Sequence, residues 1–143
     1  MPNTKLLFHY LSYLQYPIML IAVLFALQPY FNEFENFLSS INNMLIFMGL
    51  GISFSTLQDT QKTQNEMSLK IWSNPKKGRR FLIFMGILTL AFLVTGVVSI
   101  FLAEDSKIAE VGFGILVVGI GLLGMLKSGS EMFEHHRIDK TSE

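Results

Sequence analysis

A stretch without any charged side chain, from Phe81 to Ala103, is the feature that most restricts what this chain can fold into. Its 23 residues exceed the roughly 20 apolar residues that a helix needs to cross the hydrocarbon core of a bilayer. The composition agrees, because only 15% of the residues are charged, against about 25% in typical soluble domains. The segment therefore predicts a transmembrane helix.

Three weaker apolar segments accompany it, at 13–31, 41–57 and 111–126. The segment 41–57 is short and contains Asn, Ser and Thr, which favours a position inside a helical bundle. Pro17 suits the first turn of the first segment, or a kink in it, and Pro29 is expected to end it. We expect an all-α membrane protein, a single four-span domain over residues 1–143 packed as an antiparallel bundle, with spans at about 11–31, 39–58, 81–103 and 109–127.

The charges predict how these spans are oriented. Ten of the eleven Lys and Arg residues lie in the N-terminus, in the central loop at about 59–80, at Lys127 and in the tail at about 128–143 that follows it. The two connections on the other side are acidic and hold a single base, Lys107. Because basic loops stay in the cytoplasm, we expect both termini and the central loop to be cytoplasmic. We further expect the membrane to be the bacterial inner membrane.

A basic cluster lies directly before the strongest span and consists of Lys76, Lys77, Arg79 and Arg80. Nucleic acid is not the expected partner, because the net charge of the chain is zero. We interpret the basic cluster as a topology anchor that pairs with anionic headgroups, at about 1 kcal/mol per basic residue near the surface. Pro75 and Gly78 are expected to form the turn that returns the chain to the bilayer.

Trp72, just before the basic cluster, is expected to be an interfacial anchor, since Trp favours the headgroup level of a membrane. The alternative is a protein-docking patch formed by Trp72 and Ile71. The chain between Leu57 and Asn74 could continue the second span as a helix into the cytoplasm.

Small residues gather in the second and fourth spans at spacings that let helix backbones approach closely. We expect them to pack helices together within the bundle, and the alternatives are a narrow pore or a docking face for a partner. Self-association or a protein partner is expected through the same two spans. The candidate residues are Gly49, Gly51, Ser53, Ser55, Gly112, Gly119, Gly121 and Gly124.

A weak internal similarity appears at an offset of 70 residues, where Gly49-Leu50-Gly51 falls on Gly119-Ile120-Gly121. Each of these tripeptides follows a helix and an acidic connection. The pattern suggests two copies of one helical hairpin, related like the halves of a parallel membrane repeat. Convergent composition of apolar helices is the alternative.

Ionisable residues are absent from the cores of the four predicted spans, which contain no Asp, Glu, His, Lys or Arg. The chain also has no Cys. Proton relays and ion-coupled carriers place ionisable groups inside the membrane. Gly112-Phe-Gly does not continue as a dinucleotide-binding pattern. We therefore expect no enzyme activity and no cofactor.

The tail offers the one combination of metal-ligating types, namely Glu131, Glu134, His135 and His136, with His9 on the same side. Glu131 and His135 share a helix face, but zinc needs three or four ligands. We interpret the tail as a solvated helix end and expect no metal.

The resulting prediction is a small non-catalytic membrane protein that serves as an accessory or scaffold subunit of a membrane complex, or as a homo-oligomer. The main alternative is a small oligomeric channel or uncoupled transporter lined by the Gly and Ser faces of the second and fourth spans. A metal-dependent enzyme or sensor built on the tail is a third possibility.

Overall fold

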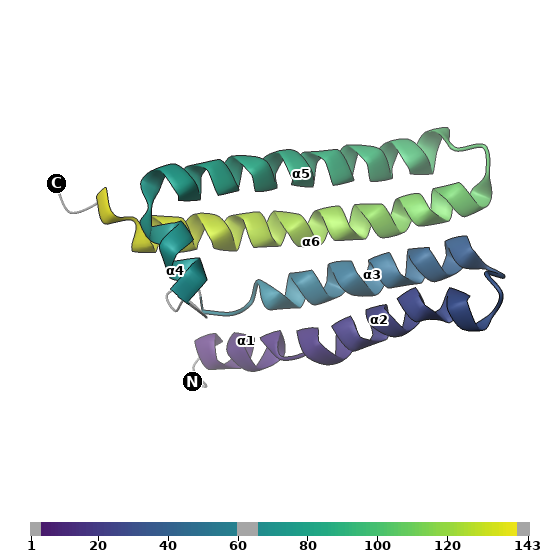
Figure 1. Cartoon of the computed structure of the whole chain (residues 1–143), viewed down its shortest axis with the longest axis horizontal. Coiled ribbons are helices and arrows are strands. Elements are labelled where there is room, and N and C mark those ends of the chain that lie inside the picture. Colours follow the sequence, from purple (N-terminus) through teal and green to yellow (C-terminus); the bar gives the residue numbers. More distant parts are fainter. Residues whose placement is uncertain (1–3, 60–65, 140–143) are drawn as a thin grey trace.

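The computed structural model describes residues 4–59 and 66–139, and this part of the chain is helical with short connections (Figure 1). Four helical stretches, Thr4–Phe31, Phe37–Ser55, Pro75–Leu102 and Ser106–His136, are long and apolar enough to cross a membrane. The predicted all-α class and the four spanning segments are therefore confirmed at the level of length and composition. The helices are α1 (Thr4–Ser12), α2 (Gln15–Phe31), α3 (Phe37–Ser55), α4 (Glu66–Ser73), α5 (Pro75–Leu102) and α6 (Ser106–His136).

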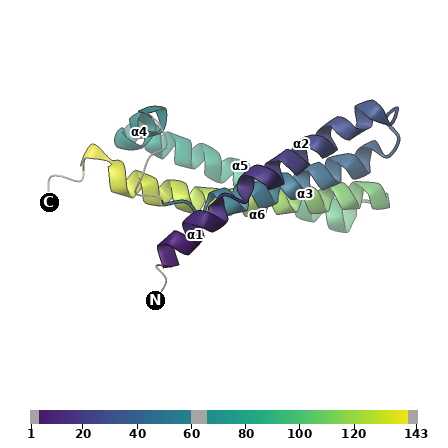
Figure 2. The same cartoon turned by 90° about the horizontal axis from the view of Figure 1, so that it is seen from below.

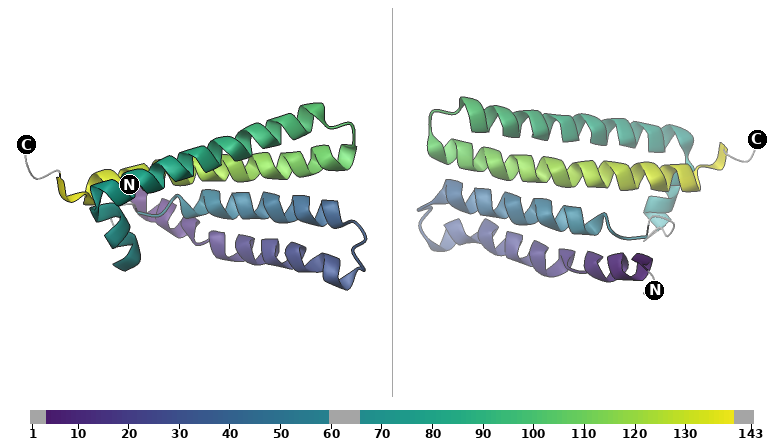
Figure 3. Two further views of the ribbon diagram at one scale, coloured as in Figure 1. Left: turned by 45° about the horizontal axis from the view of Figure 1, so that its top comes forward. Right: turned by 180° about the vertical axis from the view of Figure 1, so that it is seen from behind.

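The four long helices lie side by side as a row, in the order α2, α3, α6, α5, and this order is the same from the front and from behind (Figures 1 and 3). The connections α2–α3 and α5–α6 lie at one end of the row, which we call the outer end. The start of α1, the short helix α4 and the end of α6 lie at the other, inner end. Seen from below, the helices cross at an angle, and α4 stands outside the row beside the start of α5 (Figure 2).

The first span is longer than predicted and is interrupted near its start. Helix α1 begins at Thr4, and a turn at Tyr13 and Leu14 separates it from α2. Pro17 explains the interruption, because it has no N–H and its ring collides with the carbonyl four residues earlier, that of Tyr13. Pro29 does not end α2, which runs on to Phe31.

Helix α3 does not continue into the central loop, although the sequence allowed this. It ends at Ser55, where three hydroxyl groups turn back onto the backbone. Such bonds compete with helix continuation. The hydroxyls of Ser53, Ser55 and Thr56 donate to the carbonyls of Gly49 (2.9 Å), Ile52 (2.6 Å) and Ser53 (2.7 Å) respectively.

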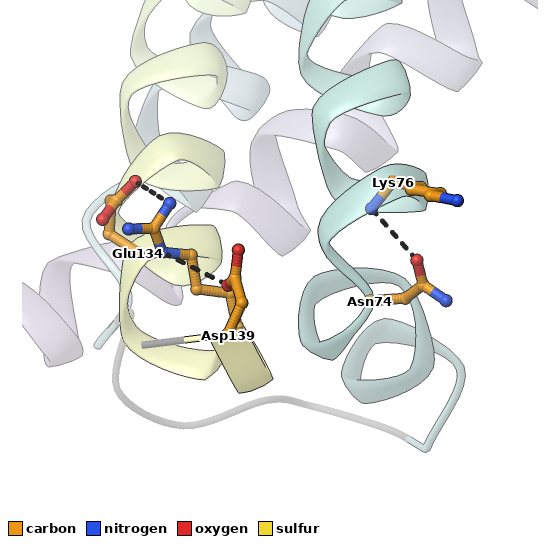
Figure 4. A network of polar contacts seen from close by, with 5 residues as sticks. Asn74, Lys76, Glu134 and Asp139 are labelled. Atoms are coloured by element: carbon orange, nitrogen blue, oxygen red, sulfur yellow. Dashed lines mark hydrogen bonds and ion pairs between the residues drawn. The ribbon is translucent and has the colours of Figure 1, made fainter. Parts of the chain in front are cut away.

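Asn74 caps the start of helix α5, because its side-chain oxygen accepts hydrogen bonds from the backbone N–H groups of Lys76 and Lys77, each at 3.1 Å (Figure 4). Pro75 occupies the first helical position, where its missing N–H does no harm. The basic cluster therefore lies on the first two turns of α5. Gly78 forms no turn, contrary to the prediction. It is a buried helical residue against the ring of Phe133 from α6.

Candidate functional site

The contact between α3 and α6 at the middle of the row follows a regular register. Two residues of α3 and the residue directly after it, spaced seven apart, meet three residues of α6 that lie 72 positions later in the sequence. A constant offset means that the two helices run in the same direction, and a seven-residue spacing is typical of a coiled-coil seam. We call this contact the central seam, and its pairs are Asn42 with Gly114, Gly49 with Gly121, and Thr56 with Ser128.

Gly49 and Gly121 bring the two backbones into direct contact. A Cβ atom on Gly49 would lie 2.7 Å from the carbonyl carbon and oxygen of Val117. A Cβ atom on Gly121 would lie 2.6 Å from the carbonyl oxygen of Gly49. Both distances are far below van der Waals contact, so only residues without a side chain permit this approach.

The other glycines named from the sequence also face helices of the same chain. The missing Cβ of Gly112 points at Ser99 and that of Gly119 at Leu93, both on α5. Gly51 faces Met19 of α2, and Gly124 faces Thr56, the residue directly after α3. These faces are occupied inside a single chain, so a pore between copies would have to be lined by other residues.

Asn42 joins α3 to α6 at the outer half of the central seam, because its side-chain oxygen accepts the backbone N–H of Gly114 at 3.1 Å. Interhelical hydrogen bonds in membranes contribute about 0.6–2 kcal/mol. We therefore expect Asn42→Ala to lower the free energy of unfolding in mixed micelles by about 1 kcal/mol. Asn43→Ala, one residue away and outside this contact, is the matched control and should change it by less than about 0.5 kcal/mol. Equal losses in the two variants would contradict a specific role of Asn42.

Trp72 is buried in the structure, whereas a protein-docking patch would expose its ring. Its role as an interfacial anchor stays a prediction. Only 8% of Trp72 is exposed. Its ring meets that of Phe81 edge-on, with centroids 5.4 Å apart, and lies over Gly129 of α6. Because Gly129 has no side chain, α4 can fold down onto the inner ends of α5 and α6.

Trp72 forms one wall of a cavity of about 270 Å³ at the inner end of the row. Residues from α2, α4, α5, α6 and the end of α3 line this cavity, which is partly open. No pattern in the sequence reveals it, since its residues come from five separate segments. The apolar lining includes Phe81, Met85, Met125 and Met132, and the polar lining includes Gln15, Ser55, Thr56 and Ser128.

The four side chains of the basic cluster are exposed at the inner end of α5. Positive charge at a helix N-terminus opposes the helix dipole, so the stability of α5 does not explain their presence. Across from them, nitrogen atoms of the Arg137 guanidinium lie 3.6 Å from a carboxylate oxygen of Glu134 and 3.7 Å from one of Asp139 (Figure 4). The same guanidinium faces the ring of Phe133. The role of the cluster as a topology anchor stays a prediction.

The tail residues considered as metal ligands make local contacts. Glu131 pairs with Lys127 at 3.0 Å, and the Nδ1 atom of His136 lies 2.9 Å from the carbonyl oxygen of Met132. His9 lies against Tyr13 of its own segment. Within residues 4–59 and 66–139, no three side chains of the His, Asp or Glu type come together in a way that could hold a metal ion.

Comparison with known proteins finds no matching family model, no matching curated protein and no matching solved structure. A function for this chain is therefore inferred from its residues and their arrangement.

Proposed function

We propose that this chain is a non-catalytic integral membrane protein that acts as an accessory or scaffold subunit, either in a complex with a larger membrane protein or as a homo-oligomer. In this proposal the spans alternate in direction along the sequence, so that both termini lie in the cytoplasm. The membrane is the bacterial inner membrane. It also includes two hairpins, α2–α3 and α5–α6, that descend from one ancestral hairpin. The charge distribution supports the cytoplasmic position of the termini, and the parallel course of α3 and α6 supports the common origin of the two hairpins.

The observation that carries the proposal is the use of the glycine faces inside the chain. Gly49, Gly121 and Gly119 are closed off by Val117, by the Gly49 carbonyl and by Leu93 respectively. The hydroxyls of Ser53, Ser55 and Thr89 donate to carbonyls of their own helices. Ionisable groups that drive coupled transport are missing from the cores of the spans.

Helices α2 and α5, at the two edges of the row, supply the surface for a partner in this proposal. Apart from α3, α2 has only weak neighbours in the row, and α5 contacts α6 and the short helix α4. Large apolar side chains project from both edges, for example Leu20 and Leu24 of α2 and Ile87 and Leu90 of α5. In a membrane, lipid or another helix can cover such faces, and close packing then favours association.

The test is the mass of the protein purified in mild detergent, together with flux measurements after reconstitution into vesicles. An accessory subunit should co-purify at a fixed ratio with a partner or with further copies of itself, and the vesicles should show no ion or solute flux. A lone monomer would contradict the proposal. Flux in the vesicles would contradict it in favour of a channel or uncoupled transporter.

A further inference from the structure

The cavity at the inner end of the row has a lining that selects for a particular kind of ligand. We propose that it binds a small, neutral aromatic molecule that carries a hydroxyl or carbonyl group. This inference goes beyond the accessory role and does not depend on it.

The size and the apolar walls favour an aromatic ring. A dry cavity of about 150 Å³ is known to hold benzene, and this cavity has about 270 Å³. The rings of Trp72 and Phe81 stand edge to face and form one wall. Met85, Met125 and Met132 supply flexible thioether side chains, which make favourable contacts with aromatic rings and adapt to their shape. A substituted single ring therefore fits the space.

The polar side of the cavity favours a ligand with one hydrogen-bonding group. The hydroxyls of Ser55 and Ser128 donate to the carbonyls of Ile52 (2.6 Å) and Thr56 (3.1 Å). A hydroxyl that donates keeps lone pairs, which can accept a hydrogen bond from a ligand. The amide of Gln15, also in the lining, offers both a donor and an acceptor to a hydroxyl or a carbonyl.

The lining also favours an uncharged ligand over a charged one. Among the described residues that form the cavity, none carries a formal charge. A carboxylate or an ammonium group would lose its hydration there without gaining a counter-ion. A lipid acyl chain is disfavoured for the opposite reason, because it would leave the hydroxyl and amide groups facing hydrocarbon.

The single tryptophan of the chain makes the proposal directly testable, since Trp72 is itself part of the wall. Bromine quenches tryptophan fluorescence at contact distance, so 4-bromophenol serves as the probe. With the full chain in lipid nanodiscs, we expect saturable quenching by 4-bromophenol. Bromobenzene should bind about fivefold more weakly, because it lacks the hydroxyl. 4-Bromobenzoate, which is charged, should cause no saturable quenching.

Variants that fill the cavity separate binding there from partition into the bilayer. Ser55→Leu on α3 and Ser128→Leu on α6 each add volume to the lining and should weaken 4-bromophenol binding by about tenfold. Ser39→Leu, an exposed position at the far end of α3, should bind like the parent protein. Circular dichroism and elution volume report whether each variant is folded. Two filling variants are used so that a folding defect in one leaves the other decisive.

Three results would overturn the proposal. The first is quenching that rises linearly with 4-bromophenol. The second is saturable quenching that neither filling variant weakens. The third is quenching of Trp72 by phosphatidylcholine with brominated acyl chains that the filling variants abolish, because this would identify an acyl chain as the occupant.

Discussion

Replacing Gly121 or Gly49 with alanine should lower the free energy of unfolding by about 2–3 kcal/mol, the upper range for overpacking of a tight interface. The added Cβ would lie 2.6 Å from the Gly49 carbonyl oxygen in the first variant and 2.7 Å from the Val117 carbonyl in the second. Backbone atoms cannot rotate away as the end of a side chain can, so α3 and α6 must separate. Unfolding in mixed micelles with increasing dodecyl sulfate, followed by the fluorescence of Trp72, measures the loss.

Gly86 provides the matched control for both substitutions. It lies within α5, and a Cβ atom placed on it would meet nothing within 4 Å. Gly86→Ala should therefore leave the free energy of unfolding unchanged or raise it by up to about 1 kcal/mol, because alanine is the better helix former. If Gly121→Ala and Gly49→Ala behaved like Gly86→Ala, the central seam would not be the close backbone contact described above.

Neutralising the basic cluster should produce molecules of mixed orientation. Single cysteines report the orientation cleanly, since the chain has none of its own. In the parent protein we expect cysteines at Ser39 and Ser106 to react with an impermeant reagent from outside the cell, and one at Ser68 to be protected. When all four residues of the basic cluster are changed to glutamine, a substantial fraction of Ser68 cysteines should become reactive from outside, because these residues supply four of the ten inward-directing charges.

The acidic residues of the outer connections give the control for this prediction. Changing Glu33, Glu35, Glu104 and Glu110 to glutamine removes the same number of charges, yet acidic residues contribute little to orientation. The labelling pattern should stay that of the parent protein. External labelling at Ser68 in the parent protein would refute the orientation itself. An unchanged pattern after loss of the basic cluster would show that other charges determine it.

The spanning helices could be predicted because a long uncharged segment such as Phe81–Ala103 has few other ways to fold. The small residues of the second and fourth spans could be named for a similar reason. The residues that they contact on neighbouring helices could not be predicted, since every apolar helix offers several faces of comparable hydrophobicity. The sequence similarity pairs Gly49 with Gly119, whereas the central seam pairs Gly49 with Gly121.

The position of Trp72 was beyond prediction for a different reason. Its location between two spans suggested a ring at the headgroup level, but its burial depends on Gly129, a residue 57 positions later with no visible connection to it in the sequence. Gly78 is a comparable case. The sequence Asn-Pro-Lys-Lys-Gly suggests a turn with glycine at its end, while the glycine in fact makes room for Phe133. In both places a glycine makes room for the ring of a residue that lies far away in the sequence.

The row of helices has a consequence for how the molecule can grow. In a closed bundle every helix faces the interior, so a further helix can pack there only if the bundle opens. A row has two margins, α2 and α5, and a further helix can be laid along either one while every existing contact persists. Assembly at these margins is additive, so a partner could attach or leave without unfolding any part of the chain.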